Sequence, residues 1–160
     1  LGAGQRGRVT QAEDLHLTLA FLGEQDEASM ATLLAIASRL ALPRCEIVLD
    51  RLGYWRHNRI LWAGPSELPP ALRNFVSSLH AGLRKTGFKL DEREFAAHVT
   101  LLRNATRLPA EQVIEPLVWP IEAWCLAESR SDETGRRYRE LASWQIDRAH
   151  HGGREPREEA

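Results

Sequence analysis

Two short stretches decide the fold of this chain: His16–Leu19, which reads His-Leu-Thr-Leu, and His98–Leu101, which reads His-Val-Thr-Leu. In each stretch, His and Thr stand two positions apart inside an apolar run. Side chains on a β-strand alternate between its two faces, so the His and Thr of each copy point the same way. Two such strands side by side would therefore present two imidazoles and two hydroxyls to one ligand.

Two imidazoles and two hydroxyls suit the chemistry of a phosphate ester. A neutral imidazole takes a proton from the attacking water, and a protonated imidazole gives one to the leaving oxygen. The ordinary pKa of His, about 6.5, allows both forms near neutral pH. Hydroxyls can donate hydrogen bonds to the phosphate oxygens. We predict that His16 and His98 are catalytic and that Thr18 and Thr100 bind phosphate.

Arg103 is a further candidate for binding phosphate, because it follows the second motif and a guanidinium can hold two phosphate oxygens. Strict alternation along a strand puts Arg103 on the face opposite Thr100. A bulge, or the end of the strand, must therefore turn Arg103 toward the motif if it binds phosphate.

Three aromatic residues are candidate surfaces on which a nucleotide base could stack: Phe21, Tyr54 and Trp55. Packing into the core is the equal alternative for each of them.

Other kinds of site find less support. Neither motif contains a Cys or a carboxylate at the spacing of metal ligands, so we expect no metal and no other cofactor. No Gly-x-Ser-x-Gly sequence occurs, which disfavours a serine hydrolase.

The composition is that of a soluble globular protein, with 160 residues and a net charge of −1. A nucleic-acid ligand would therefore have to bind a local basic patch. No apolar run approaches the about 20 residues that span a bilayer, so we expect no membrane contact. Cys45 and Cys125 are expected to be buried, free thiols of a cytoplasmic protein, with a disulfide between them as the less favoured alternative. We expect the protein to be a monomer.

The expected elements mix strands and helices without strict alternation, which favours an α+β fold. We expect residues 1–148 to form one bilobal domain and residues 149–160 to form a disordered tail. The expected strands are 15–22, 45–52, 59–63, 98–102, 119–129 and 137–146, the expected helices are 26–42 and 69–86, and a short helix or turn is expected at 110–116.

The two motifs, with Phe21–Gly23, Arg103 and Leu52–Trp55, resemble the 2H phosphoesterase family. The nearest branch is the LigT-like RNA 2′,3′-cyclic phosphodiesterases, historically called 2′-5′ RNA ligases. The resemblance covers roughly Val9 to Ile146. It implies a bilobal α+β fold with two pseudo-symmetric antiparallel sheets, helices outside, and a central cleft lined by the two motifs.

The same resemblance implies hydrolysis of an RNA or nucleotide 2′,3′-cyclic phosphate to a 2′-phosphate, without metal. His16 would be the acid at the leaving 3′-oxygen and His98 the base that activates water, although these roles can be exchanged. Thr18 and Thr100 would hold the phosphate, assisted by Arg103. Two alternatives stay open: a module that binds RNA ends without catalysis, and a 2′-5′ RNA ligase.

Two features depart from the family pattern. Family members usually have a strand and a helix before the first motif, and here about fifteen residues precede His16, so we expect that strand and helix to be missing. The residue before the second His is commonly Pro in this branch and is Ala97 here.

Overall fold

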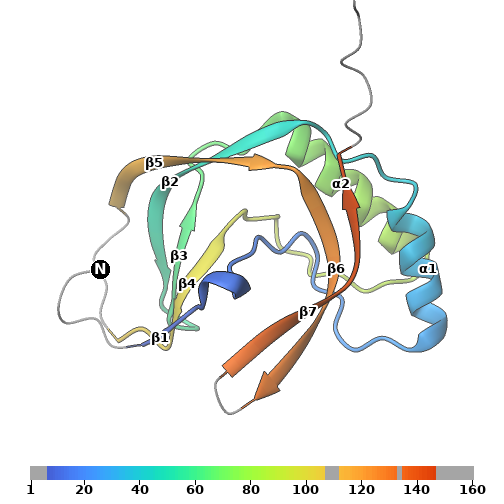
Figure 1. Cartoon of the computed structure of the whole chain (residues 1–160), viewed down its shortest axis with the longest axis horizontal. Coiled ribbons are helices and arrows are strands. Elements are labelled where there is room, and N and C mark those ends of the chain that lie inside the picture. Colours follow the sequence, from blue (N-terminus) through green and yellow to red (C-terminus); the bar gives the residue numbers. More distant parts are fainter. Residues whose placement is uncertain (1–6, 107–111, 133–134, 147–160) are drawn as a thin grey trace, which may run out of the picture.

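The structure is a computed structural model that describes residues 7–106, 112–132 and 135–146. It contains two antiparallel sheets, as the family resemblance implied (Figure 1). The five-stranded sheet has the order β1-β4-β3-β2-β5, and β6 pairs with β7 in the second sheet. The strands are β1 (Arg8–Val9), β2 (Cys45–Trp55), β3 (Ile60–Gly64), β4 (Val99–Arg103), β5 (Gln112–Ile121), β6 (Ala123–Asp132) and β7 (Gly135–Gln145).

Two helices and one 3-10 turn complete the described elements: α1 (Glu27–Ala37), α2 (Pro70–Lys85) and η1 (Ala12–Asp14). The carboxylate of Asp26 accepts a hydrogen bond from the backbone N–H of Ser29, so Asp26 caps α1. Proline occupies the first position of α2, where its missing N–H costs no helical hydrogen bond. In Figure 1 both helices lie outside the strands, and η1 lies between β4 and β7.

The core forms where α2 packs against the five-stranded sheet. Phe75 and Val76 of α2 are buried against Ile47 of β2 and Val99 of β4. Because Val99 faces this core, alternation turns its neighbour Thr100 toward the opposite side of the sheet. A second cluster joins α1 to α2 through Leu33, Leu79 and Leu83.

The first His-Thr motif is not a strand, which corrects the prediction of a strand at 15–22. The motif pairs with the sheet through one isolated antiparallel bridge, between Leu17 and Val99. The backbone beyond the bridge is held by a side chain, because the imidazole Nε2 of His80 on α2 lies 2.8 Å from the carbonyl oxygen of Leu19. This contact gives the Leu19 carbonyl a hydrogen-bond partner at a point where the segment is not paired with a strand.

Helix α1 ends earlier than the predicted residue 42. After Ser38 the hydrogen bonds span three residues instead of four, from Arg39 N–H to the Ile36 carbonyl and from Leu40 N–H to the Ala37 carbonyl. Such a tightened turn is a common way for a helix to end.

The helix or turn predicted at 110–116 is also wrong where the structure describes it, because β5 covers Gln112–Ile121. Pro116 lies at an irregularity of the pairing, where the partner of β2 moves from Leu117 to Val113. Proline cannot donate a ladder hydrogen bond, and an irregular edge strand tolerates it. The strand predicted at 119–129 is two strands, because β5 and β6 separate at Glu122. The predicted tail at 149–160 lies outside the described residues.

Both cysteines are free thiols, but Cys125 is exposed and Cys45 is partly exposed, so they are not fully buried as expected. Among the described residues, no helix is both long and apolar enough to cross a membrane.

Candidate active site

The two motifs meet in a crossed arrangement. Leu17 and Val99 are antiparallel partners, so the register across this bridge sets His16 opposite Thr100 and Thr18 opposite His98. Thr100 is only 8% exposed, whereas Thr18 is exposed and both imidazoles are half-buried. Each histidine therefore faces the hydroxyl residue of the other motif.

Both imidazoles are oriented in the same way by the backbone two residues earlier. Nδ1 of His16 lies 2.6 Å from the carbonyl oxygen of Asp14, and Nδ1 of His98 lies 2.8 Å from that of Ala96. A carbonyl oxygen can only accept, so Nδ1 is the donor in each contact. Nε2 of each ring is therefore the nitrogen available to a ligand, as an acceptor in the neutral ring or as a donor in the protonated one.

Each imidazole also packs against one aromatic ring. The ring of Trp55, at the end of β2, meets the His98 ring edge-on, with centroids 4.5 Å apart. The ring of Tyr138, on β7, lies 4.2 Å from the His16 ring. Trp55 is in turn 5.5 Å from Trp62 of β3. These contacts limit the rotation of both imidazoles.

The surroundings of His98 favour its neutral form. Burial lowers the pKa of His98, and the positive charges of His16 and Arg103 lower it further, while the hydrogen bond to Ala96 acts in the opposite direction. A histidine with a lowered pKa is neutral over more of the acidic range, and a neutral imidazole is what a general base requires.

A bulge in β4 brings Arg103 to the same side as Thr100. Thr100 pairs with Trp62 and Leu102 pairs with Leu61, so Leu101 is an extra residue on β4. One extra residue reverses the alternation that follows it. Arg103 and Thr100 accordingly line one pocket together with His16, and its other lining residues are Arg8, Val9, Thr10, Gln11, Asp14, Arg137 and Tyr138.

The model of the 2′-5′ RNA ligase superfamily matches residues 5–151. This chain belongs to that superfamily.

Relatives of the chain carry a more specific name. The RNA 2′,3′-cyclic phosphodiesterase of Escherichia coli K12 is 35% identical over 102 residues, which cover 64% of this chain and 58% of the relative. The protein of the same name from Thermus thermophilus is 31% identical over 149 residues, covering 86% and 74%. The chain thus aligns with less than two thirds of the E. coli relative's length.

Solved structures show the same fold. E. coli LigT complexed with 3′-AMP superimposes with a TM-score of 0.78 at 30% identity, over 88% of this chain and 82% of LigT. The TT0787 structure from T. thermophilus gives 0.77 at 25% identity, over 92% and 85%.

In this member of the 2′-5′ RNA ligase superfamily, the pocket contains residues that were not predicted, and among them Asp14, Arg137 and Tyr138 hold the segment that carries His16. Asp14 is 7% exposed, and its carboxylate accepts from the Arg137 guanidinium at 3.0 Å and from the backbone N–H of Tyr138 at 3.3 Å. Asp14 thereby joins the segment that carries His16 to β7. Its position two residues before His16 was visible in the sequence, but nothing there indicated that β7 would be its partner.

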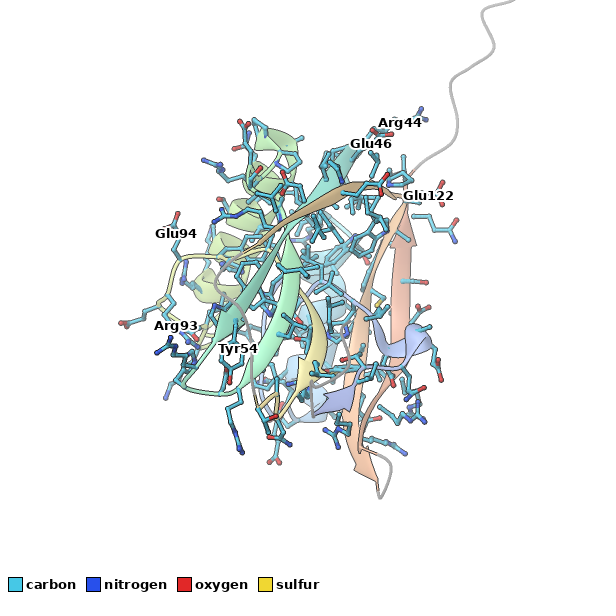
Figure 2. The ribbon with its side chains drawn as sticks, turned by 90° about the vertical axis from the view of Figure 1, so that its left-hand side faces the viewer. Arg44, Glu46, Tyr54, Arg93, Glu94 and Glu122 are labelled. Carbon is cyan, nitrogen blue, oxygen red and sulfur yellow. The ribbon has the colours of Figure 1, made fainter. Side chains whose placement is uncertain are left out.

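The three aromatic candidates have different surroundings. Tyr54 donates its hydroxyl to the Ala105 carbonyl at 3.0 Å and packs beside Leu61, which is the core-packing alternative. In Figure 2, Tyr54 lies toward the lower end of β2 and Glu46 toward the upper end. Phe21 is 67% exposed and does not line the pocket described above. Trp55 is the one of the three that contacts a motif histidine.

The part of the chain that the structure describes contains no set of side chains that could coordinate a metal ion. No three His, Cys, Asp or Glu side chains gather there closely enough to hold an ion.

Proposed function

We propose that this chain is a metal-independent phosphodiesterase that opens a 2′,3′-cyclic phosphate, on an RNA end or a small nucleotide, to a 2′-phosphate. The observation that carries the proposal is the pair of imidazoles on either side of one bridge, each with Nδ1 bonded to the backbone and Nε2 available. The names of the E. coli and T. thermophilus relatives support the choice of substrate.

The reaction is one in-line displacement. Nε2 of neutral His98 takes a proton from water as the water oxygen attacks phosphorus, and the bond from phosphorus to the 3′-oxygen breaks. Protonated His16 gives its Nε2 proton to that 3′-oxygen. The products are a 3′-hydroxyl and a 2′-phosphate, and the proton taken up by His98 later returns through solvent to His16. The lowered pKa of His98 supports this assignment of the base.

The remaining site residues hold the phosphate and the nucleoside. The hydroxyls of Thr18 and Thr100 donate to the non-bridging oxygens, and the guanidinium of Arg103 stabilises the negative charge that builds up on them. Trp55 and Phe21 are the proposed surfaces for the base, because Trp55 borders His98 and Phe21 is exposed. Tyr54 has a structural role instead, because its hydroxyl donates a hydrogen bond to the Ala105 carbonyl.

The family description favours one second candidate, a 2′-5′ RNA ligase. Ligation is the same displacement with a 5′-hydroxyl in place of water as the attacking nucleophile: the 5′-oxygen bonds to phosphorus, the bond to the 3′-oxygen breaks, and a 2′-5′ linkage results. The two activities are separated by the ratio of hydrolysed to joined product.

The deciding experiment offers adenosine 2′,3′-cyclic phosphate, and a short RNA that ends in a cyclic phosphate, to the protein with EDTA present. The products are resolved into 2′- and 3′-phosphates. Formation of the 2′-phosphate in EDTA is the expected result. Binding of the RNA without turnover would instead support a module that binds RNA ends, and activity that EDTA abolishes would contradict the metal-independent mechanism.

We further propose that the protein acts as a cytoplasmic monomer. The free thiols of Cys45 and Cys125 support a reducing compartment. Light scattering of the purified protein tests the oligomeric state, and a dimer mass would contradict the proposal.

A further inference from the structure

The pocket beside His16 is rich in arginine. Arg8 of β1 and Arg103 of β4 are direct cross-strand partners, and both line the pocket. Like charges directly opposite each other on antiparallel strands destabilise a sheet. Neither guanidinium forms an ion pair with a carboxylate of the described residues. An anion bound between them would remove this repulsion.

The third arginine, Arg137, approaches the same pocket from β7. It bonds to the buried carboxylate of Asp14, so its charge is partly compensated. Asp14 is the one carboxylate among the lining residues, against three guanidinium groups. The pocket therefore keeps a net positive charge when His16 is neutral, and a larger one when His16 is protonated.

The pocket extends away from the reacting groups. Its lining includes His16, Thr100 and Arg103, and continues to Gln11 and Arg8, but it includes neither His98 nor Thr18. A phosphate held between the two imidazoles would occupy only one end of this space. The arginine-lined remainder carries the charge to attract a second anionic group of the same ligand.

We propose that Arg8 and Arg137 bind a second phosphate of the substrate, the one on the 5′-oxygen of the terminal nucleoside, and that Arg103 is shared between this phosphate and the cyclic one. The inference rests on the proposed function, since the anionic groups of a nucleotide substrate are its phosphates. Planar guanidinium groups hold phosphate oxygens in pairs, which suits three arginines around one pocket. The preferred substrate is therefore a nucleotide with a phosphate at its 5′ side, and not a nucleoside cyclic phosphate alone.

Four substrates test this subsite by their kcat/KM values: adenosine 2′,3′-cyclic phosphate, its 5′-phosphorylated form, the dinucleotide ApA ending in a cyclic phosphate, and that dinucleotide with a neutral methylphosphonate linkage. We expect the second and third to exceed the first by about tenfold, mainly through KM. The methylphosphonate should lose this advantage although it keeps both bases. The 5′-monoester and the dinucleotide distinguish a mononucleotide ligand from an RNA chain.

The variant Arg8→Gln tests the residue itself. We expect the ratio of kcat/KM with and without the 5′-phosphate to fall toward one. This ratio is independent of the fraction of active protein, so partial unfolding does not imitate the result. Arg39→Gln, an exposed arginine outside the pocket, is the matched control and should keep the wild-type ratio. A ratio near one in the wild type, or a ratio unchanged in Arg8→Gln, would overturn the proposal.

A binding measurement separates this inference from the proposed function. Calorimetry compares adenosine 2′-phosphate with adenosine 2′,5′-bisphosphate, and needs no turnover. Tighter binding of the bisphosphate that is lost in Arg8→Gln supports the subsite even if no substrate is hydrolysed, in which case only the proposed function fails. Equal binding of both compounds contradicts the subsite.

Discussion

The backbone carbonyl of Asp14 accepts the Nδ1 proton of His16 at 2.6 Å, while the carboxylate of the same residue holds β7 through Arg137 and the backbone of Tyr138. Tyr138 in turn places its ring against His16. The orientation of this imidazole thus depends on contacts to β7 of the second sheet. Asp14 is a positioning residue for His16.

Replacing Asp14 tests this positioning role. Asp14→Ala leaves the N–H of Tyr138 without its side-chain acceptor and Arg137 without its buried carboxylate, so we expect the free energy of unfolding to fall by about 1–3 kcal/mol. We also expect kcat to fall by about tenfold with little change in KM, because a misaligned acid slows the chemical step. Thermal unfolding and steady-state kinetics measure the two effects.

Glu13→Ala is the matched control, because it removes the exposed partner of Arg137 and should change stability by less than about 1 kcal/mol. Equal effects of the two variants would contradict a special role of Asp14.

The two imidazoles should be needed equally. Loss of one general acid or base lowers rates by about 10²–10⁴-fold, and we expect kcat to fall by this much in both His16→Asn and His98→Asn. Circular dichroism checks that each variant stays folded. His57→Asn, which changes an exposed loop histidine, should keep wild-type kcat. A nearly normal rate in either motif variant would rule out the two-histidine mechanism.

The rate should depend on pH through His98. The base must be neutral, and its pKa is lowered by burial and by the charges of His16 and Arg103. The rate should therefore rise with pH along an acidic limb that lies below the ordinary His value of about 6.5. Removing the positive charge in Arg103→Gln raises the pKa of His98, so that limb should move to higher pH.

The pH profile of kcat/KM in wild type and Arg103→Gln measures this shift. Arg103→Lys keeps the charge and should restore the position of the limb, although not the full rate. A limb that moves to lower pH in Arg103→Gln would contradict the assignment of His98 as the base.

The paired motifs and most helices and strands could be predicted from the sequence, because they depend on the local spacing of residues. The helix predicted at 69–86 is found at Pro70–Lys85, and the hairpin after Cys45 has its two strands. Contacts between segments that are distant in the sequence could not be predicted in this way. The bulge at Leu101 depends on the register with Leu61 and Trp62 of another strand. The imidazole of His80 contacts the Leu19 carbonyl next to the first motif, and no sequence pattern around either residue predicts this contact.

Gly53 provides a test of the packing behind His98. An added Cβ at Gly53 would lie 2.0 Å from a ring atom of Trp62, which packs against Trp55. Gly53→Ala must displace the Trp62 ring, and we expect a loss of about 1–3 kcal/mol in the free energy of unfolding. Denaturant titration measures it. Gly82→Ala, in α2, meets Ile36 at 3.3 Å and gains helix propensity, so it should stay within about 1 kcal/mol of wild type.

Because Leu17 forms only an isolated bridge, we expect the site to lose its structure before the hydrophobic core does. His98 is anchored next to a strand in the interior of a five-stranded sheet, whereas the His16 segment is held by one bridge to Val99 at the edge of β4 and by the contacts of Asp14 to β7. Segments with few ladder bonds open in sub-global excursions that need less free energy than complete unfolding. On heating, hydrogen exchange at the amides around Leu17 should accelerate before that of β2, and activity should disappear while α2 and the large sheet remain folded. The upper working temperature of this protein is then set by the few contacts that hold the His16 segment, and not by its hydrophobic core.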